Sequence, residues 1–181
     1  GILAGYLGGW VDAVIMRAMD VLLAFPGILL ALAIVAVLGK SLTNVMLAVG
    51  ISAIPLFTRI VRSSTLTIKQ LEYVTAARAL GASPLRIMRS HVLPNVTTPI
   101  IVIATNSIAG AIIAGAALSF LGLGAQSPTP EWGLMLAEGR VYLRSASWLT
   151  RYPGFAIMVT VLAINLLGDG LRDVLDPKLR I

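Results

Sequence analysis

The sequence predicts an all-α integral membrane protein, a polytopic bundle of helices, and three observations lead to this class. Of its 181 residues, 57% are hydrophobic and only 12% are charged, whereas an average soluble domain contains roughly 25% charged residues. The mean hydropathy is +0.91. The apolar residues gather in four runs, each close to the roughly 20 residues that an α-helix needs to cross a hydrocarbon core.

Ahead of these runs stands the apolar stretch GILAGYLGG, which has neither an initiator Met nor the basic start of a signal peptide. We expect it to be the end of a span, with at least one earlier helix missing. The four full runs are Met19–Leu38, Thr43–Val61, Val96–Leu123 and Tyr152–Leu167, of which the last is the shortest.

The positions of Lys and Arg predict which side each loop faces. Residues 59–95 hold six of the 14 basic residues and only one acidic residue, Glu72. Cytoplasmic loops carry an excess of Lys and Arg, so we expect a cytoplasmic loop at 59–95 and, two spans later, a cytoplasmic C-terminus. Residues 122–151 then form an external loop. The net charge of +6 follows from this topology and needs no nucleic-acid partner.

The longest polar stretch, EYVTAARALGASPLRIMRSHVLPNV, lies in the predicted cytoplasmic loop. Tyr73, Ala76, Ala77 and Leu80 recur at the spacing of one helix face. Gly81 follows and can adopt the left-handed conformation that ends a helix. The stretch therefore begins with a short amphipathic helix that stops at Gly81.

A second short helix is predicted directly after this turn. Ser83 and Pro84 form an N-cap and first-turn pair. Leu85, Met88 and Val92 then lie along one face, and Pro94 is expected to end the helix. The whole is a helix, a three-residue turn and a helix at the cytoplasmic membrane surface.

Two interpretations of this hairpin remain open from the residues alone. In one, it is an interfacial amphipathic hairpin whose arginines meet anionic lipid headgroups. In the other, it docks into a partner protein: the small Ala76 and Ala77 admit a groove, Glu72 and Arg78 orient it, and Gly81 holds the angle between the helices.

The pattern Ala-Ala, three residues, Gly, then twelve residues to Pro resembles the cytoplasmic EAA loop of ABC importer permeases, whose coupling helix sits in a cleft of the ATPase subunit. The residues at the family's positions are Ala76, Ala77, Gly81, Leu93 and Pro94. Thr75 replaces the usual Glu, and His91 replaces the usual Ile. These departures are typical of the dipeptide, oligopeptide and nickel branch of that family.

Further stretches carry the same resemblance over essentially the whole chain. They are GYLGGWVD, LSFLGLG, EWGLML and NLLGDGLRDVLDPKLR. The sequence is most similar to the second, or C-type, permease of the heteromeric importers in that branch. The resemblance implies a type I importer permease of six transmembrane helices, of which about five are present here, in one domain over residues 1–181.

The resemblance also implies the function and the partners. The chain would form, with a homologous permease subunit, the translocation path for peptides or a related small solute, with nickel and glutathione as further candidates. Two cytoplasmic ATPase subunits would bind and hydrolyse ATP, so the chain itself would be no enzyme and hold no cofactor. An external solute-binding protein would dock at residues 122–151, although that loop could instead be a lid packed on the chain's own helices. Membrane lipid would surround the spans, in a bacterial or archaeal plasma membrane.

The resemblance assigns ten residues to coupling with the ATPase. They are Glu72, Thr75, Ala76, Ala77, Arg78, Gly81, Ser83, Pro84, Leu93 and Pro94.

The rival class is a secondary transporter or channel subunit that carries an interfacial hairpin. Ion-coupled carriers usually place carboxylates within the bilayer, whereas the eight acidic residues here all lie at span ends or in loops. The stretch VLGKS resembles the end of a phosphate-binding loop, but Ile34 stands where that loop needs Gly. The absence of Cys excludes disulfides, thiolate catalysis and Cys-ligated metals, and the single His91 cannot form a metal site made of His ligands alone.

Small and polar residues within the apolar runs predict helix contacts. Small residues recur every fourth position at Gly1, Gly5 and Gly9 and again at Ala111, Gly115 and Ser119, a spacing that lets membrane helices pack closely. Asn106 and Asn165 lie nearest the centres of their spans. We expect each carboxamide to form a hydrogen bond between helices, with a place along the translocation path as the alternative.

Overall fold

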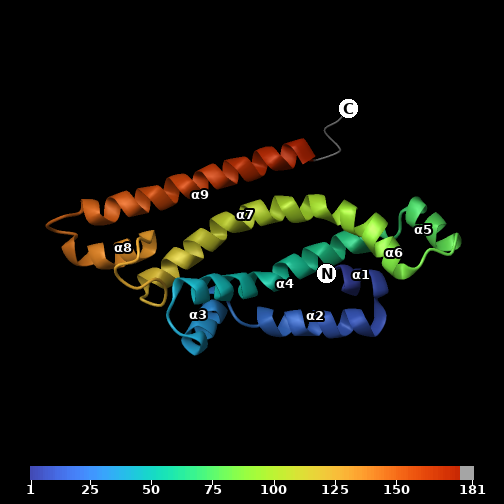
Figure 1. Ribbon diagram of the computed structural model, residues 1–181, viewed down its shortest axis with the longest axis horizontal. Helices are drawn as coiled ribbons and strands as arrows, with labels where there is room; N and C mark the ends of the chain where they lie inside the picture. Colours follow the sequence, from blue (N-terminus) through green and yellow to red (C-terminus); the bar gives the residue numbers. More distant parts are fainter. Residues whose placement is uncertain (176–181) are drawn as a thin grey trace. The chain divides into compact units, whose positions relative to one another are not determined.

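The computed structural model describes residues 1–175, and every regular element in that range is helical (Figure 1). The elements are α1 (Ile2–Leu7), α2 (Gly9–Leu23), α3 (Gly27–Leu38), α4 (Leu42–Ile68), α5 (Glu72–Ala79), α6 (Pro84–Ile87), the π turn η1 (Met88–Val92), α7 (Leu93–Phe120), α8 (Trp132–Gly139), the 3-10 turn η2 (Arg140–Tyr142) and α9 (Trp148–Leu175). The last part of the predicted cytoplasmic tail, residues 176–181, lies outside the described residues.

Three of the described helices are long and apolar enough to cross a membrane. They are Leu42–Ile68, Pro84–Phe120 and Trp148–Val174, and a fourth span results if α2 and α3 together form one bent span. These helices contain most of the predicted runs after residue 42 and extend beyond several of their ends. The all-α membrane class is therefore confirmed. The expected total of about five also counted the apolar stretch at residues 1–9, where the structure has the six-residue helix α1.

The predicted span Met19–Leu38 is divided, and Pro26 is the reason. The helix α2 ends at Leu23 and α3 begins at Gly27. Proline has no N–H to donate and disfavours a helical conformation at the residue before it. Pro26 itself has an extended backbone, with φ −53° and ψ 132°, and acts as the residue that caps α3. The apolar run was correctly located, but its continuity as one helix was wrong.

The described chain groups into two compact units. Unit 1 consists of Gly1–Ala24 and Ile54–Ala104, and unit 2 consists of Phe25–Ala53 and the chain from Thr105 onward. The buried core of unit 1 contains Ile68, Val74, Ile87, Val92 and Val96. The buried core of unit 2 contains Ala31, Val35, Val45, Ala48 and Leu118.

Within unit 2, the predicted external loop contains a helix packed on the chain's own helices. The Glu131 carboxylate accepts hydrogen bonds from the backbone N–H groups of Gly133 and Leu134, at 2.9 and 2.7 Å, and so starts α8. A Cβ at Gly133 would overlap the carbonyl of Ala116 in α7. Close packing of α8 therefore supports the lid alternative for this loop, while its external position stays a prediction.

Small residues also allow close contacts elsewhere, as expected from their spacing. A Cβ at Gly5 of α1 would lie 2.8 Å from the Cβ of Thr65 in α4, and one at Gly1 would lie 2.5 Å from the Cβ of Val61. Gly9 differs, because a Cβ there would meet nothing within 4 Å. In unit 2, Ser119 is fully buried. The prediction of small-residue packing is confirmed for Gly1 and Gly5, whereas in α7 Ala111 is exposed and the buried Ser119 lies against Gly124 of the following turn.

Candidate functional site

The predicted hairpin forms, and a Schellman turn ends its first helix. After α5, the N–H of Gly81 donates to the carbonyl of Arg78 at 3.0 Å, and the N–H of Ala82 donates to the carbonyl of Ala77 at 3.1 Å. This pair of bonds needs a left-handed residue between helix and turn. Gly81 supplies it with φ +82°. The prediction for Gly81 is confirmed.

The second helix begins where the sequence predicts it. The Ser83 hydroxyl accepts a hydrogen bond from the backbone N–H of Arg86 at 3.4 Å, and Pro84 occupies the first turn of α6. Proline is well suited to this position because the N–H it lacks would have no partner inside the helix.

Pro94 does not end this helix, so that prediction is wrong. The residues from Pro84 to Phe120 form one continuous helical stretch, in which Pro94 is the second residue of α7. The π turn η1 precedes it, and the N–H of Leu93 donates to the carbonyl of Met88, five residues back. A π turn widens the helix by one residue, which gives the proline ring room. The Asn95 side chain donates to the His91 carbonyl at 2.6 Å and so satisfies a carbonyl near the proline.

The core beneath the hairpin uses a different face from the predicted one. Val74, Ile87 and Val92 are fully buried, as is Val96 of α7, and Ile68 at the end of α4 is 8% exposed. Ala77 and the α1 residues Ile2 and Tyr6 pack against this cluster. Two apolar stripes run along α5, and periodicity cannot choose between them. Packing of α5 on α6 and α1 selects the stripe of Val74 and Ala77.

As a consequence, large apolar side chains of the hairpin point outward. Leu80 is 89% exposed and Leu85 is 72% exposed, although both were assigned to the apolar faces of their helices. We use the term hairpin surface for the exposed residues Glu72, Thr75, Ala76, Arg78, Leu80, Gly81, Ser83, Pro84 and Leu85. Seven of the ten predicted coupling residues belong to it. Ala77 instead faces the core, and Leu93 and Pro94 are exposed at the start of α7, beyond the π turn.

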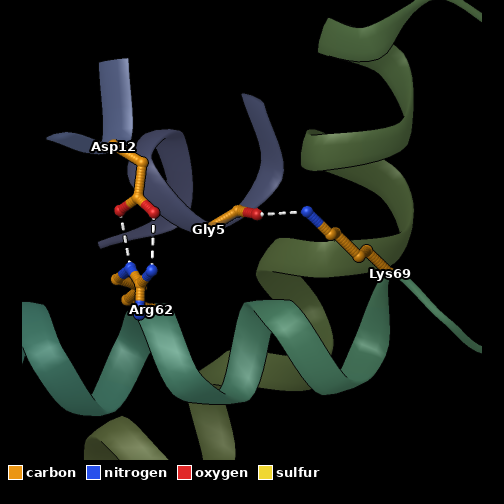
Figure 2. A network of polar contacts seen from close by, with 4 residues as sticks. All are labelled: Gly5, Asp12, Arg62 and Lys69. Carbon is orange, nitrogen blue, oxygen red and sulfur yellow. Dashed lines mark hydrogen bonds and ion pairs between the residues drawn. The ribbon is translucent and has the colours of Figure 1, made fainter. Parts of the chain in front are cut away.

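Basic residues of α4 and the following turn hold α1 and α2 in unit 1 (Figure 2). Arg62 donates to both carboxylate oxygens of Asp12 in α2, at 2.6 Å from Nε and 2.5 Å from Nη2. Lys69 Nζ donates to the carbonyl of Gly5 in α1 at 2.8 Å. Arg59 and Asp20 form a further pair at 2.7 Å.

These contacts were missed at the sequence level, where the basic residues served only to predict the side of the membrane. The signal that could have found them is the rarity of acidic residues: Asp12 and Asp20 are the only ones before Glu72. In a membrane protein with so few carboxylates, each is a candidate partner for a nearby Arg. Arg78 of the hairpin also lies over the ring of Tyr6 in α1, 5.9 Å from its centroid.

The site therefore combines long apolar helices, a hairpin that exposes two leucines, and an underlying core that does not need those leucines. Among residues 1–175, no three His, Asp or Glu side chains come together as metal ligands. Such a surface is suited to binding another protein or a membrane surface.

Residues 1–181 match the family described as binding-protein-dependent transport system inner membrane component, and the chain belongs to that family. The resemblance noted in the sequence is thereby confirmed.

Individual relatives carry more specific names. The chain is 52% identical over 180 residues to the dipeptide transport system permease protein DppC of Alkalihalophilus pseudofirmus, which covers 99% of this chain and 59% of that protein. It is 54% identical over 180 residues to the glutathione transport system permease protein GsiD of Pectobacterium atrosepticum, covering 99% of this chain and 60% of the relative. The protein of the same name from Escherichia coli is 55% identical over 175 residues. The chain thus spans about three-fifths of the length of these relatives.

Proposed function

We propose that the chain is a transmembrane permease subunit of an ATP-binding-cassette importer. With a homologous permease subunit it forms the translocation path for peptides or a related small solute such as glutathione. Two cytoplasmic ATPase subunits supply the energy, and an external solute-binding protein delivers the solute. The relatives are named for dipeptide and glutathione transport, which supports a peptide-like solute.

The observation that carries the coupling role is the hairpin surface. The core beneath it is complete, because Val74, Ile87 and Val92 are already fully buried. Leu80 and Leu85 therefore add nothing to that core and still present large apolar side chains outward. Exposed apolar patches on folded surfaces mark interaction sites. The small Ala76 beside them lets a partner's groove approach the helix backbone.

Most of the surface of the spans is not covered by the described residues. Only 17%, 11% and 6% of the most apolar windows of α4, of Pro84–Phe120 and of α9 are buried inside the chain. Lipid can cover such surfaces, but a path for a polar solute needs helices on all sides. A second permease subunit would supply them.

The rival interpretation, an interfacial hairpin, has support from the same surface, because Leu80 and Leu85 beside Arg78 and Arg86 would also suit a membrane surface. Cross-linking decides between the two. The natural chain has no Cys, so Thr75→Cys and Leu80→Cys give unique reactive sites. In inside-out vesicles of the complete transporter, both should cross-link to the ATPase subunit.

A matched control is Ser127→Cys, in the predicted external loop, which should give no such cross-link. If Leu80→Cys reacts only with lipid-phase reagents while the ATPase subunits are present, the hairpin is an interfacial element and the coupling role is wrong.

A further inference from the structure

Two carboxamides in the middle of membrane helices lack the expected partners. Asn106 lies midway along α7, and Asn165 lies just past the middle of α9. Both side chains are exposed. Neither carboxamide forms a hydrogen bond within residues 1–175, so the expected bonds between helices are not present there. An amide group facing hydrocarbon has no water to bond with, which makes such a position costly. These two groups need polar surroundings that the described residues 1–175 do not supply.

The two asparagines lie at the same place in unit 2, where α7 meets α9. The nearest atom to a Cβ built at Gly168 of α9 would be Oδ1 of Asn106, at 2.5 Å. The Asn106 carboxamide therefore occupies the space that Gly168 leaves free. Asn165 precedes Gly168 by three residues, and side chains at that spacing are neighbours on a helix, about 5–6 Å apart.

Polar residues continue from this point along one side of α9. Asn165, Asp169 and Arg172 follow each other at i, i+4 and i+7, and all three are exposed. Residues at these spacings share one helix face. The ion pairs found within residues 1–175 are Arg59–Asp20 and Arg62–Asp12, so neither Asp169 nor Arg172 has an ion-pair partner there. We call Asn106, Asn165, Asp169 and Arg172 the polar stripe.

Another side of α9 is apolar. Leu167 is 69% exposed and Val174 is 68% exposed, and at seven residues apart they share a face. At 100° per residue, Leu167 points about 200° away from Asn165 around the helix axis. From Asn165 to Arg172 the exposed side of α9 next to its contact with α7 is polar and the opposite exposed side is apolar, whereas one and two turns before Asn165 the exposed Leu162 and Met158 occupy the same face as Asn165. Asp169 and Arg172 lie towards the end of the span Trp148–Val174, so the carboxamides are the polar groups of the stripe that lie deepest in the membrane helices.

We propose that the polar stripe lines the translocation path and contacts the solute during passage. This inference rests on the proposed function as a permease. The carboxamides can both donate to and accept from the amide groups of a peptide. Asp169 matches the α-ammonium group and Arg172 matches the α-carboxylate of a zwitterionic solute. Single weak contacts of this kind favour passage, because a solute that binds too tightly does not leave.

Accessibility to a charged reagent tests the proposal. Asn106→Cys, Asn165→Cys and, as the matched control on the apolar side of α9, Leu167→Cys are each assembled into the complete transporter in lipid vesicles. A charged methanethiosulfonate reagent should modify both Asn positions at least about tenfold faster than the control, because charged groups are excluded from hydrocarbon. A transported dipeptide with ATP present should change the rate at the Asn positions only.

Equal rates of modification at Asn165→Cys and Leu167→Cys would overturn the proposal, because Asn165 would then be no more accessible to water than the apolar side of α9. Asn165→Cys is the decisive variant if Asn106→Cys fails to assemble, because the space beside Gly168 is occupied by Asn106. ATP-driven uptake by the unmodified complex is measured in the same vesicles. Absence of that uptake contradicts the proposed function, whereas normal uptake with slow labelling contradicts the polar stripe alone.

Discussion

Gly81 shows how one residue can set the geometry of the hairpin. Its φ of +82° lies in the region that other L residues rarely adopt. A Cβ at this position would meet nothing within 4 Å, so space is not the constraint. Any cost of substitution at Gly81 therefore comes from the backbone conformation, and residues that tolerate that conformation should be accepted.

Replacing Gly81 with Val should uncouple ATP hydrolysis from transport. A β-branched residue at positive φ costs about 1–3 kcal/mol, which is too little to unfold the long helices but enough to open the Schellman turn and change the angle between α5 and α6. Uptake of solute should fall while the ATPase subunits remain bound. The measurement is uptake and ATPase activity of the purified complex in vesicles.

The control for this variant is Gly81→Asn, because Asn tolerates the left-handed conformation better than other residues. It should keep most of the coupled uptake. Normal uptake in Gly81→Val would show that the turn has no coupling role, and loss of the ATPase subunits on purification would show that it serves assembly.

At the scale of elements, two ion pairs join α2 to α4, and their surroundings differ. The side chains of Arg62 and Asp12 are 31% and 18% exposed, whereas those of Arg59 and Asp20 are 52% and 48% exposed. Only the first pair forms two parallel hydrogen bonds. Paired charges that are partly shielded from water contribute more than exposed pairs.

We therefore expect Asp12→Asn to destabilise the protein more than Asp20→Asn. Asn keeps one of the two oxygen acceptors for Arg62 but loses the charge that strengthens both hydrogen bonds, whereas an exposed single-bond pair contributes little to stability. The melting temperature of the purified complex should fall clearly for Asp12→Asn and little for Asp20→Asn. Equal shifts would mean that α2 is not held on α4 by the Arg62 contact.

The prolines show which elements the sequence could predict. Pro26 divides an apolar run that hydropathy alone treats as one span, and the rule that proline interrupts a helix would have located the break. At Pro94 the opposite happens: the π turn η1 precedes this proline, and the helix continues through it. No local sequence pattern predicts a π turn, because such a turn forms where the chain must fit one extra residue between two packed segments.

The hairpin shows the same limit in its side chains. The turn at Gly81 and the cap at Ser83 depend on local backbone chemistry, and both were predicted. The buried face depends on what packs beneath, namely Ile2 and Tyr6 of α1, which lie about 70 residues away in the chain. Leu80 and Leu85 were therefore assigned to the wrong side.

For the whole molecule, the alternation of basic and apolar segments predicts the side of each loop. The same rule that predicts a cytoplasmic position for residues 59–95 predicts an external position for residues 122–151. The structure adds that α8 in this segment is a packed helix, with Glu131 as its cap. A binding protein would thus meet a preformed surface.

Ser127→Cys tests this topology in intact cells whose outer barrier has been opened. Ser127 is exposed, so an impermeant maleimide added from outside should label it, and excess binding protein should slow the labelling. Thr75→Cys is the control and should react only after the membrane is made permeable. Labelling of Ser127→Cys from the cytoplasmic side alone would reverse the entire predicted orientation.

The π turn η1 also fixes the rotational phase of the hairpin. An α-helix turns by about 100° with each residue, and the turn at Met88–Val92 holds one residue more than an α-helical turn. Removing one residue there would restore regular α geometry and swing α5 and α6 around the axis of α7 by roughly a quarter turn. Leu80 and Leu85 would then point in another direction relative to α7, and the packing of Val74 and Ile87 on Val96 would change as well. The direction in which the hairpin surface faces thus depends on the one additional residue in η1.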